Sequence, residues 1–149
     1  MTKFQFSSLA YIKHLNVRKE GPVEEKTLAV DIKFEGRTGA ALCDFFDPKL
    51  RDFLFQDEVI ARPQMMEPVG FINLLEHCEM TILDQLFTDV KLHKFKLRPV
   101  DGGQIELTFS ASFNPTKNEV AILAEYVSKS VPVTCKPQPA LDFDAEVQQ

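Results

Sequence analysis

The sequence predicts an α+β fold: a single domain over residues 1–136 with an antiparallel sheet of about five to six strands and two to three short helices. Apolar and polar residues alternate over residues 27–35 and 104–113, which is the period of a half-buried strand. Short turns join successive strand patterns, and short connections favour antiparallel pairing. Helical spacing is confined to two stretches, near residues 40–55 and 117–128, so strands and helices do not alternate as in a doubly wound fold.

The first two strands are predicted at residues 9–17 and 27–35. In the first, the apolar face is expected to carry Leu9, Tyr11, Leu15 and Val17, with Lys13 breaking the pattern. In the second, the apolar face is expected to carry Leu28, Val30, Ile32 and Phe34. Gly21 and Pro22 mark a turn between them. The two strands should therefore pair antiparallel.

Two short helices are predicted next, over residues 40–46 and 47–55. Asp47 and Pro48 suit the start of the second helix, because Asp accepts from free first-turn amides and Pro needs no hydrogen bond there. Its apolar face is expected to carry Leu50, Phe53 and Leu54. An extended loop is predicted over residues 57–68. The secondary structure of residues 69–75 is ambiguous, and the alternation of a strand returns over residues 78–83.

The clearest element is a hairpin over residues 93–113, with Asp101, Gly102 and Gly103 as its turn. A two-residue loop would set charged residues of one strand against apolar residues of the other. A three-residue loop pairs Arg98 with Glu106, Lys96 with Thr108, Leu97 with Leu107 and Phe95 with Phe109. We therefore expect the three-residue loop.

A third helix is predicted over residues 117–128, capped by Thr116 or Asn118. The Val and Ile content there would also suit a strand. A last strand follows at residues 131–135, and Pro132 places it at a sheet edge or at a strand start. Residues 136–140 form a stiff linker, and residues 137–149 are expected to be a flexible acidic tail.

Composition narrows the class of protein. Thirteen Phe and no Trp indicate aromatic residues that fill a core. No stretch reaches the roughly 20 apolar residues of a membrane span, so we expect a soluble cytoplasmic protein that does not bind a membrane. Cys43, Cys78 and Cys135 are expected to be buried, reduced thiols.

The sequence favours a protein that is not an enzyme and needs no metal or other cofactor. His14, His77 and His93 are too scattered to predict a metal site, and neighbouring His77 and Cys78 would point to opposite faces of a strand. No phosphate-binding Gly-rich loop, nucleophile elbow or metalloprotease motif occurs.

The outer face of the hairpin is the candidate site for nucleic-acid binding. Lys94, Lys96 and Arg98 would lie about 7 Å apart along one strand, near the spacing of phosphates in an extended single strand. Thr108, Ser110 and Ser112 on the neighbouring strand could donate hydrogen bonds to phosphate oxygens. The alternative is an ordinary solvated sheet face, and no aromatic residue for base stacking is expected there.

Two resemblances bear on function. Pro137, Gln138 and Pro139, followed by Asp142, Phe143, Asp144 and Glu146, resemble the acidic tip of single-stranded-DNA-binding proteins, although the chain ends in Gln149 and not in an aromatic residue. The resemblance implies that these acidic and aromatic residues contact a protein partner. Residues 16–20, 28–34 and 46–55 resemble uncharacterised proteins of tailed phages and prophages, which implies a small accessory protein.

The function predicted from the sequence is a non-enzymatic, phage-type accessory binding protein of DNA metabolism. Its partners would be single-stranded nucleic acid and a host or phage protein. One alternative is a protein-binding inhibitor or adaptor that acts on a host nuclease or defence complex, with acidic surfaces that mimic DNA. Another is a structural component of a virion. The sequence does not predict the oligomeric state.

Overall fold

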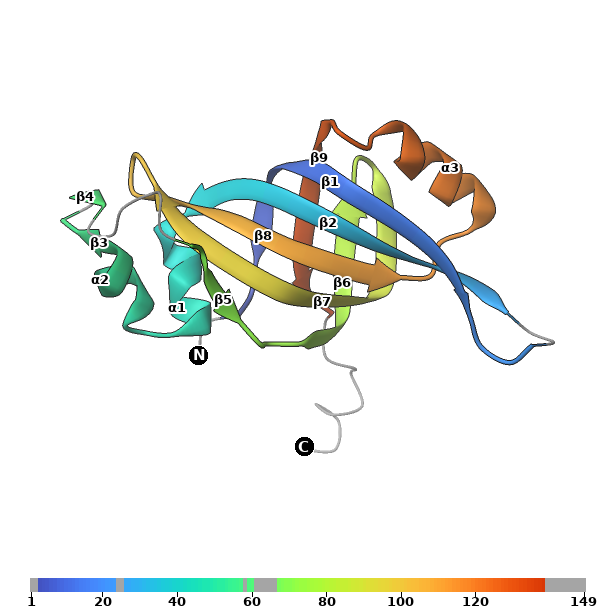
Figure 1. The fold of residues 1–149 in the computed structure, drawn as a ribbon, viewed down its shortest axis with the longest axis horizontal. Helices are drawn as coiled ribbons and strands as arrows, with labels where there is room; N and C mark the ends of the chain where they lie inside the picture. Colours follow the sequence, from blue (N-terminus) through green and yellow to red (C-terminus); the bar gives the residue numbers. More distant parts are fainter. Residues whose placement is uncertain (1–2, 24–25, 58, 61–66, 139–149) are drawn as a thin grey trace, which may run out of the picture.

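Strands make up most of the chain, as the alternating patterns predict. The computed structural model describes residues 3–23, 26–57, 59–60 and 67–138 (Figure 1). Its strands are β1 (Phe6–Glu20), β2 (Thr27–Gly39), β3 (Phe55–Gln56), β4 (Val59–Ile60), β5 (Val69–Phe71), β6 (Leu75–Ile82), β7 (Gln85–Val100), β8 (Gln104–Phe113) and β9 (Ser130–Pro137). Its helices are the 3-10 turn η1 (Ala40–Leu42), α1 (Cys43–Phe46), α2 (Leu50–Leu54) and α3 (Lys117–Glu125).

The main sheet closes on itself. Within the described residues, β7, β6, β9, β1, β2 and β8 are hydrogen-bonded in that order, and β8 pairs in turn with β7. Every pair in this ring is antiparallel. β5 adds to β7 outside the ring and makes a seven-stranded sheet, while β3 and β4 form a separate pair. The antiparallel α+β prediction is confirmed, but the sheet is larger than predicted.

Two long, bent strands give the ring its layers. Figure 1 shows β1, β2, β8 and β7 side by side in front, with β6 and β9 running crosswise behind them. β1 pairs with β9 through Phe6–Tyr11 and with β2 from Ala10 onward, and a bulge between Ile12 and His14 lies where it leaves β9. β7 has a bulge between His93 and Lys96 in its pairing with β8. Such bulges bend a strand from one layer into the other.

The predicted hairpin forms β7 and β8 with the expected register. Val100 pairs with Gln104 across the three-residue turn, and Gly102 and Gly103 have φ values of 83° and 69°. Lys96 pairs with Thr108, Leu97 with Leu107 and Arg98 with Glu106. Phe95 is not paired with Phe109 by backbone register because of the bulge, but the two rings stack with centroids 6.2 Å apart. β7 starts at Gln85, eight residues before the predicted hairpin.

The core lies inside the ring and is rich in phenylalanine, as predicted. Its largest fully buried side chains include Phe4, Phe6, Phe34, Phe95 and Phe109. Apart from the stacked pair of Phe95 and Phe109, their rings meet edge to face or tilted, and Phe4 and Phe95 have centroids 5.3 Å apart. These contacts add to the free energy gained from burying apolar surface. All three cysteines are buried here as free thiols.

The apolar face predicted for the first strand is wrong at Leu9, Tyr11 and Val17, but Leu15 packs against the core as predicted. Leu9 and Tyr11 point outward and are 62% and 38% exposed, whereas Ala10 and Ile12 are fully buried. The alternation assumed one regular strand over residues 9–17, but the bulge after Ile12 changes which face is buried. In β2 the predicted face is confirmed for Val30, Ile32 and Phe34, which are fully buried.

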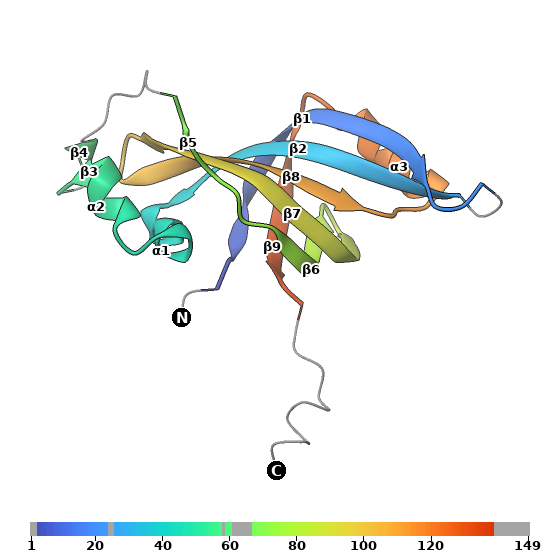
Figure 2. The ribbon, with the colours of Figure 1, turned by 60° about the horizontal axis from the view of Figure 1, so that its bottom comes forward.

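The helices lie at the two ends of the ring, where Figure 2 shows α1 and α2 at one end and α3 at the other. Near the start of α2, the Asp47 carboxylate accepts a hydrogen bond of 2.7 Å from the Lys49 amide. Leu50 and Leu54 are buried, while Phe53 is 44% exposed. At α3, Thr116 is the cap and not Asn118, because Thr116 and Glu119 form a reciprocal capping box.

The last strand is not an edge strand, in contrast to one of the two predicted placements. β9 pairs with β1 on one side and with β6 on the other. Pro132 is tolerated because the β6 ladder reaches only Val133, paired with Ile82. Beyond that point the Leu83 amide donates to the Pro132 carbonyl at 3.0 Å. The proline therefore lies near the strand start, where the ladder requires no further donor.

Candidate functional site

The outer face of the front layer carries rows of polar side chains that cross four strands. One row contains Asn16, Asp31, Ser112 and Lys91, which are successive backbone partners on β1, β2, β8 and β7. The next row contains His14, Lys33, Ser110 and His93. Since alternate residues of a strand point to the same face, these rows share the side opposite the phenylalanine core.

These rows form the floor of an open groove with a volume of about 1000 Å³. One wall is formed by Phe71 at the end of β5 and by Ile72, Asn73 and Leu74 in the connection to β6. The other lining residues are polar: His14, Asn16, Arg18, Asp31, Lys33, Lys91, His93, Lys94, Lys96, Thr108, Ser110 and Ser112. We call this surface the basic groove.

The charge of the basic groove is opposite to that of the whole chain. Its lining includes five cationic side chains, namely Arg18, Lys33, Lys91, Lys94 and Lys96, and one carboxylate, Asp31, which gives a formal charge of +4. The chain as a whole has a formal charge of -5. Within the described residues, Lys33, Lys91, Lys94 and Lys96 take part in none of the ion pairs. Four ammonium groups are therefore available to an anionic ligand.

Asp31, the one carboxylate among the described residues that line the groove, already has hydrogen-bond partners. Asp31 accepts a hydrogen bond of 3.0 Å from Arg18 Nε and one of 2.5 Å from the Ser112 hydroxyl. The hydrogen bond from Arg18 is the main cause that holds the pKa of Asp31 below its usual value, and the Ser112 bond acts in the same direction. Asp31 thus forms its ion pair with Arg18 and not with the lysines of the groove.

His93 extends this network across the groove floor. Its Nε2 lies 2.9 Å from the Ser112 Oγ. Because the Ser112 hydroxyl donates its one hydrogen to Asp31, Nε2 carries the hydrogen that Ser112 accepts. Burial lowers the pKa of His93, and Lys94 and Lys91 lower it further, while Asp31 opposes them. The imidazole is therefore mainly neutral near pH 7.

The structure brings together most of the residues expected at this site. Lys94, Lys96, Thr108 and Ser110 all line the basic groove, and so does Ser112. Lys94 lies in the β7 bulge with a φ of 56°, so it does not continue a regular strip along the strand. Ser110 is only 9% exposed and offers little of its hydroxyl to a ligand.

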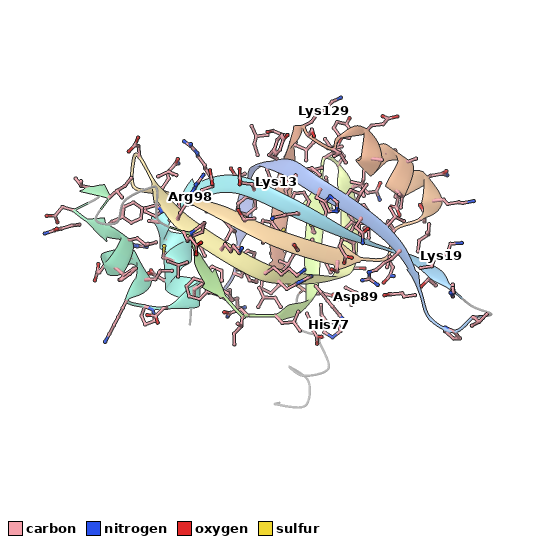
Figure 3. All side chains as sticks on the ribbon, viewed as in Figure 1. Lys13, Lys19, His77, Asp89, Arg98 and Lys129 are labelled. Carbon is pink, nitrogen blue, oxygen red and sulfur yellow. The ribbon has the colours of Figure 1, made fainter. Side chains whose placement is uncertain are left out.

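Arg98 lies apart from this group. Its Nη2 is 2.6 Å from Glu106 Oε1, and the Glu106 side chain is only 13% exposed. Figure 3 shows Arg98 toward the end of β7 that leads into the turn. Arg98 does not line the basic groove, and we leave it out of the candidate interface.

Several residues of the basic groove were not predicted from the sequence. Lys33 and Arg18 come from β2 and β1, and nothing in the local pattern indicates that β2 lies next to β8. The alternation over residues 27–35 places Lys33 on the polar face of its strand. The position of Lys33 relative to Lys94, however, depends on pairing between distant segments. The exposed apolar wall at Ile72 and Leu74 falls in the stretch that was ambiguous in sequence.

The candidate partner-binding residues Asp142, Phe143, Asp144 and Glu146 lie outside the described residues. Among the residues described, no group of three or more His, Cys, Asp or Glu side chains is placed to hold a metal ion. In that same part of the chain, no helix combines the length and the apolar character needed to cross a membrane. Comparison of the chain with protein-family models, with curated proteins and with solved structures finds no match.

Proposed function

We propose that this protein is a non-enzymatic accessory protein of DNA metabolism that binds single-stranded nucleic acid in the basic groove. The observation that supports this most is the +4 formal charge of the groove on a chain whose net charge is -5. Lysine ammonium groups bind phosphates mainly through charge, and the release of counterions from the strand favours binding. The Thr108 hydroxyl beside Lys96 can donate to a phosphate oxygen.

The dimensions of the groove favour a single strand over a duplex. Its floor spans β1, β2, β8 and β7, and three spacings between neighbouring strands amount to about 14 Å. Ile72 and Leu74 border this floor on the β7 side. The major groove of B-DNA alone is about 12 Å wide, so a complete double helix is too wide to enter. A single sugar-phosphate chain is narrow enough to lie on this floor beside Lys91, Lys94 and Lys96 of β7.

The salt dependence of binding tests this proposal. The affinity of the full chain for a fluorescent single-stranded oligonucleotide is measured by anisotropy at several salt concentrations, for the wild type and for K91A/K94A/K96A. If these lysines neutralise phosphates, the variant should bind more weakly at low salt. The slope of log K against log salt should become shallower by about 2, because each phosphate that is no longer neutralised reduces it by roughly 0.7.

A matched variant controls for the change in net charge. Lys117, Lys129 and Lys136 are exposed and lie outside the basic groove, so K117A/K129A/K136A removes the same charge elsewhere. This control should keep the wild-type slope within about 0.5. An equal loss in both triple variants would mean that binding follows net charge and not the groove. A wild type that does not bind at low salt would end the proposal.

A second candidate function is a protein-binding inhibitor or adaptor that acts on a host nuclease or defence complex. It is favoured by the charge outside the basic groove, since a net charge of -5 with +4 in the groove leaves -9 on the rest of the chain. An excess of carboxylates of this size can imitate the phosphates of DNA. Inhibition of DNA degradation in a host extract, without oligonucleotide binding, would favour this function over the first.

A further inference from the structure

Two apolar side chains stand exposed on the wall of the basic groove. Ile72 is fully exposed, and Leu74 is 56% exposed. Both lie in the three-residue connection from β5 to β6, and both line the groove together with Lys94 and Lys96. Single exposed apolar residues are common on proteins, but here two of them meet a row of cations in one concave surface.

The fold holds this wall in place beside the lysines. On one side of the connection Phe71 pairs with Phe95, and on the other side Leu75 pairs with Leu92. The connection therefore runs along the β7 segment that contains His93 and Lys94. Figure 2 shows β5 lying along β7 before the chain continues into β6. In addition, the Phe71 ring stacks on Phe46 with centroids 4.7 Å apart, which anchors the start of the wall.

An amphipathic surface of this kind suits a ligand that is anionic on one side and apolar on the other. Inorganic polyanions offer only charge, and a duplex hides the faces of its bases in the stack. A single strand offers phosphates on its backbone and unstacked bases whose faces can pack against apolar side chains.

We propose that Ile72 and Leu74 contact bases of a strand whose phosphates lie on Lys91, Lys94 and Lys96. These two residues would then determine specificity, because they make the groove select single strands that carry bases over duplexes and over base-free polyanions. This inference rests on the proposed function and assigns the two sides of the ligand to two sides of the same groove.

The test compares two probes of equal length and charge: a single-stranded oligonucleotide and an abasic sugar-phosphate oligomer. For I72S/L74S, affinity for the oligonucleotide should fall roughly five- to tenfold, since one or two bases no longer pack against an apolar wall. Affinity for the abasic oligomer and the slope of log K against log salt should stay unchanged. Wild-type protein should also bind the single strand more tightly than the corresponding duplex.

The control variant is L86S/I122S, which changes one Leu and one Ile that are both 52% exposed and lie outside the basic groove. It should bind both probes as the wild type does, and circular dichroism shows whether all variants are folded. Unchanged affinity of I72S/L74S for the oligonucleotide, or an equal loss on both probes, would overturn this inference while the lysine effect still supports the proposed function. Absence of any wild-type binding would overturn both.

Discussion

At the scale of single residues, the basic groove shows how a carboxylate can lie among lysines without cancelling their charge. Asp31 is bonded to Arg18 and to the Ser112 hydroxyl, so its lone pairs are occupied by groups on β1 and β8. Hydrogen bonds to a charged group are worth about 1.5–3 kcal/mol each when well formed, and less where solvent reaches them. The lysines on β7 and Lys33 on β2 remain free to meet a ligand.

The same network makes stability depend on pH through His93. Its pKa is lowered in the folded protein from the ordinary value of 6.5, chiefly by burial. The contribution of the neutral imidazole to stability is therefore complete above pH 6.5. As the pH falls below 6.5, the unfolded chain takes up a proton before the folded chain does, so the free energy of unfolding decreases. The decrease ends once the pH is below the pKa of His93 in the folded protein.

Urea denaturation of the wild type and of H93Q between about pH 5 and pH 8 tests this prediction by measuring the free energy of unfolding at each pH. Glutamine can still donate to Ser112 but does not titrate. On acidification from pH 8, the free energy of unfolding should fall more steeply for the wild type than for H93Q. A difference between the two proteins that stays constant across this range would contradict the assignment of His93.

At the scale of elements, the capping box sets the start of α3. The Glu119 amide donates to the Thr116 hydroxyl at 3.2 Å, and the Thr116 amide donates to the Glu119 carboxylate at 2.8 Å. T116A should lower the free energy of unfolding by about 1 kcal/mol, because it leaves one first-turn amide without its partner. The sequence allowed Asn118 as the cap instead, so N118A is the matched control and should change stability by less than about 0.5 kcal/mol. Equal losses in chemical denaturation would show that Thr116 has no special role.

The hairpin of β7 and β8 was predictable because its information is local. The three-residue turn and the alternation on both sides of it leave one register that keeps apolar residues together, and the pairing of Lys96 with Thr108 follows from it. The bulges were not predictable in the same way. Lys94 has a φ of 56°, which lysine does not favour. This backbone conformation results from the bulge at which β7 bends in its pairing with β8.

At the scale of the whole molecule, the site depends on contacts between segments that are far apart in the sequence. Lys33 reaches the groove through pairing of β2 with β8, and Arg18 through pairing of β1 with β2. No periodicity reports such pairings, because each strand pattern shows which face is buried and not which strand lies next to it. Local patterns therefore yielded Lys94 and Lys96, while the opposite side of the groove required the closed sheet.

Closure of the ring predicts where the molecule is most resistant to opening. β9 is the last strand in the described part of the chain and contains Pro132 and Pro137, which in an open sheet would suit a frayed edge. Here it lies between β1 and β6, and Val131, Val133 and Cys135 are buried in the core. Each of its amides faces one neighbour, and separating β9 from either neighbour opens the ring, so their exchange should follow global unfolding.

The amides of β9 are compared with those of the distal part of β1. The residues of β1 beyond Ile12 pair with β2 and no longer with β9. In native-state hydrogen exchange followed by NMR, amides of Val133 and Thr134 should exchange at least about a hundredfold more slowly than those of Val17 and Lys19. The reason is that one side of the distal β1 segment can open without breaking the ring, whereas β9 cannot separate without exposing Phe6 and Met80 on its neighbours. Exchange of the β9 amides as fast as that of distal β1 would mean that the ring opens at β9, and that the closed sheet is not the unit that unfolds cooperatively.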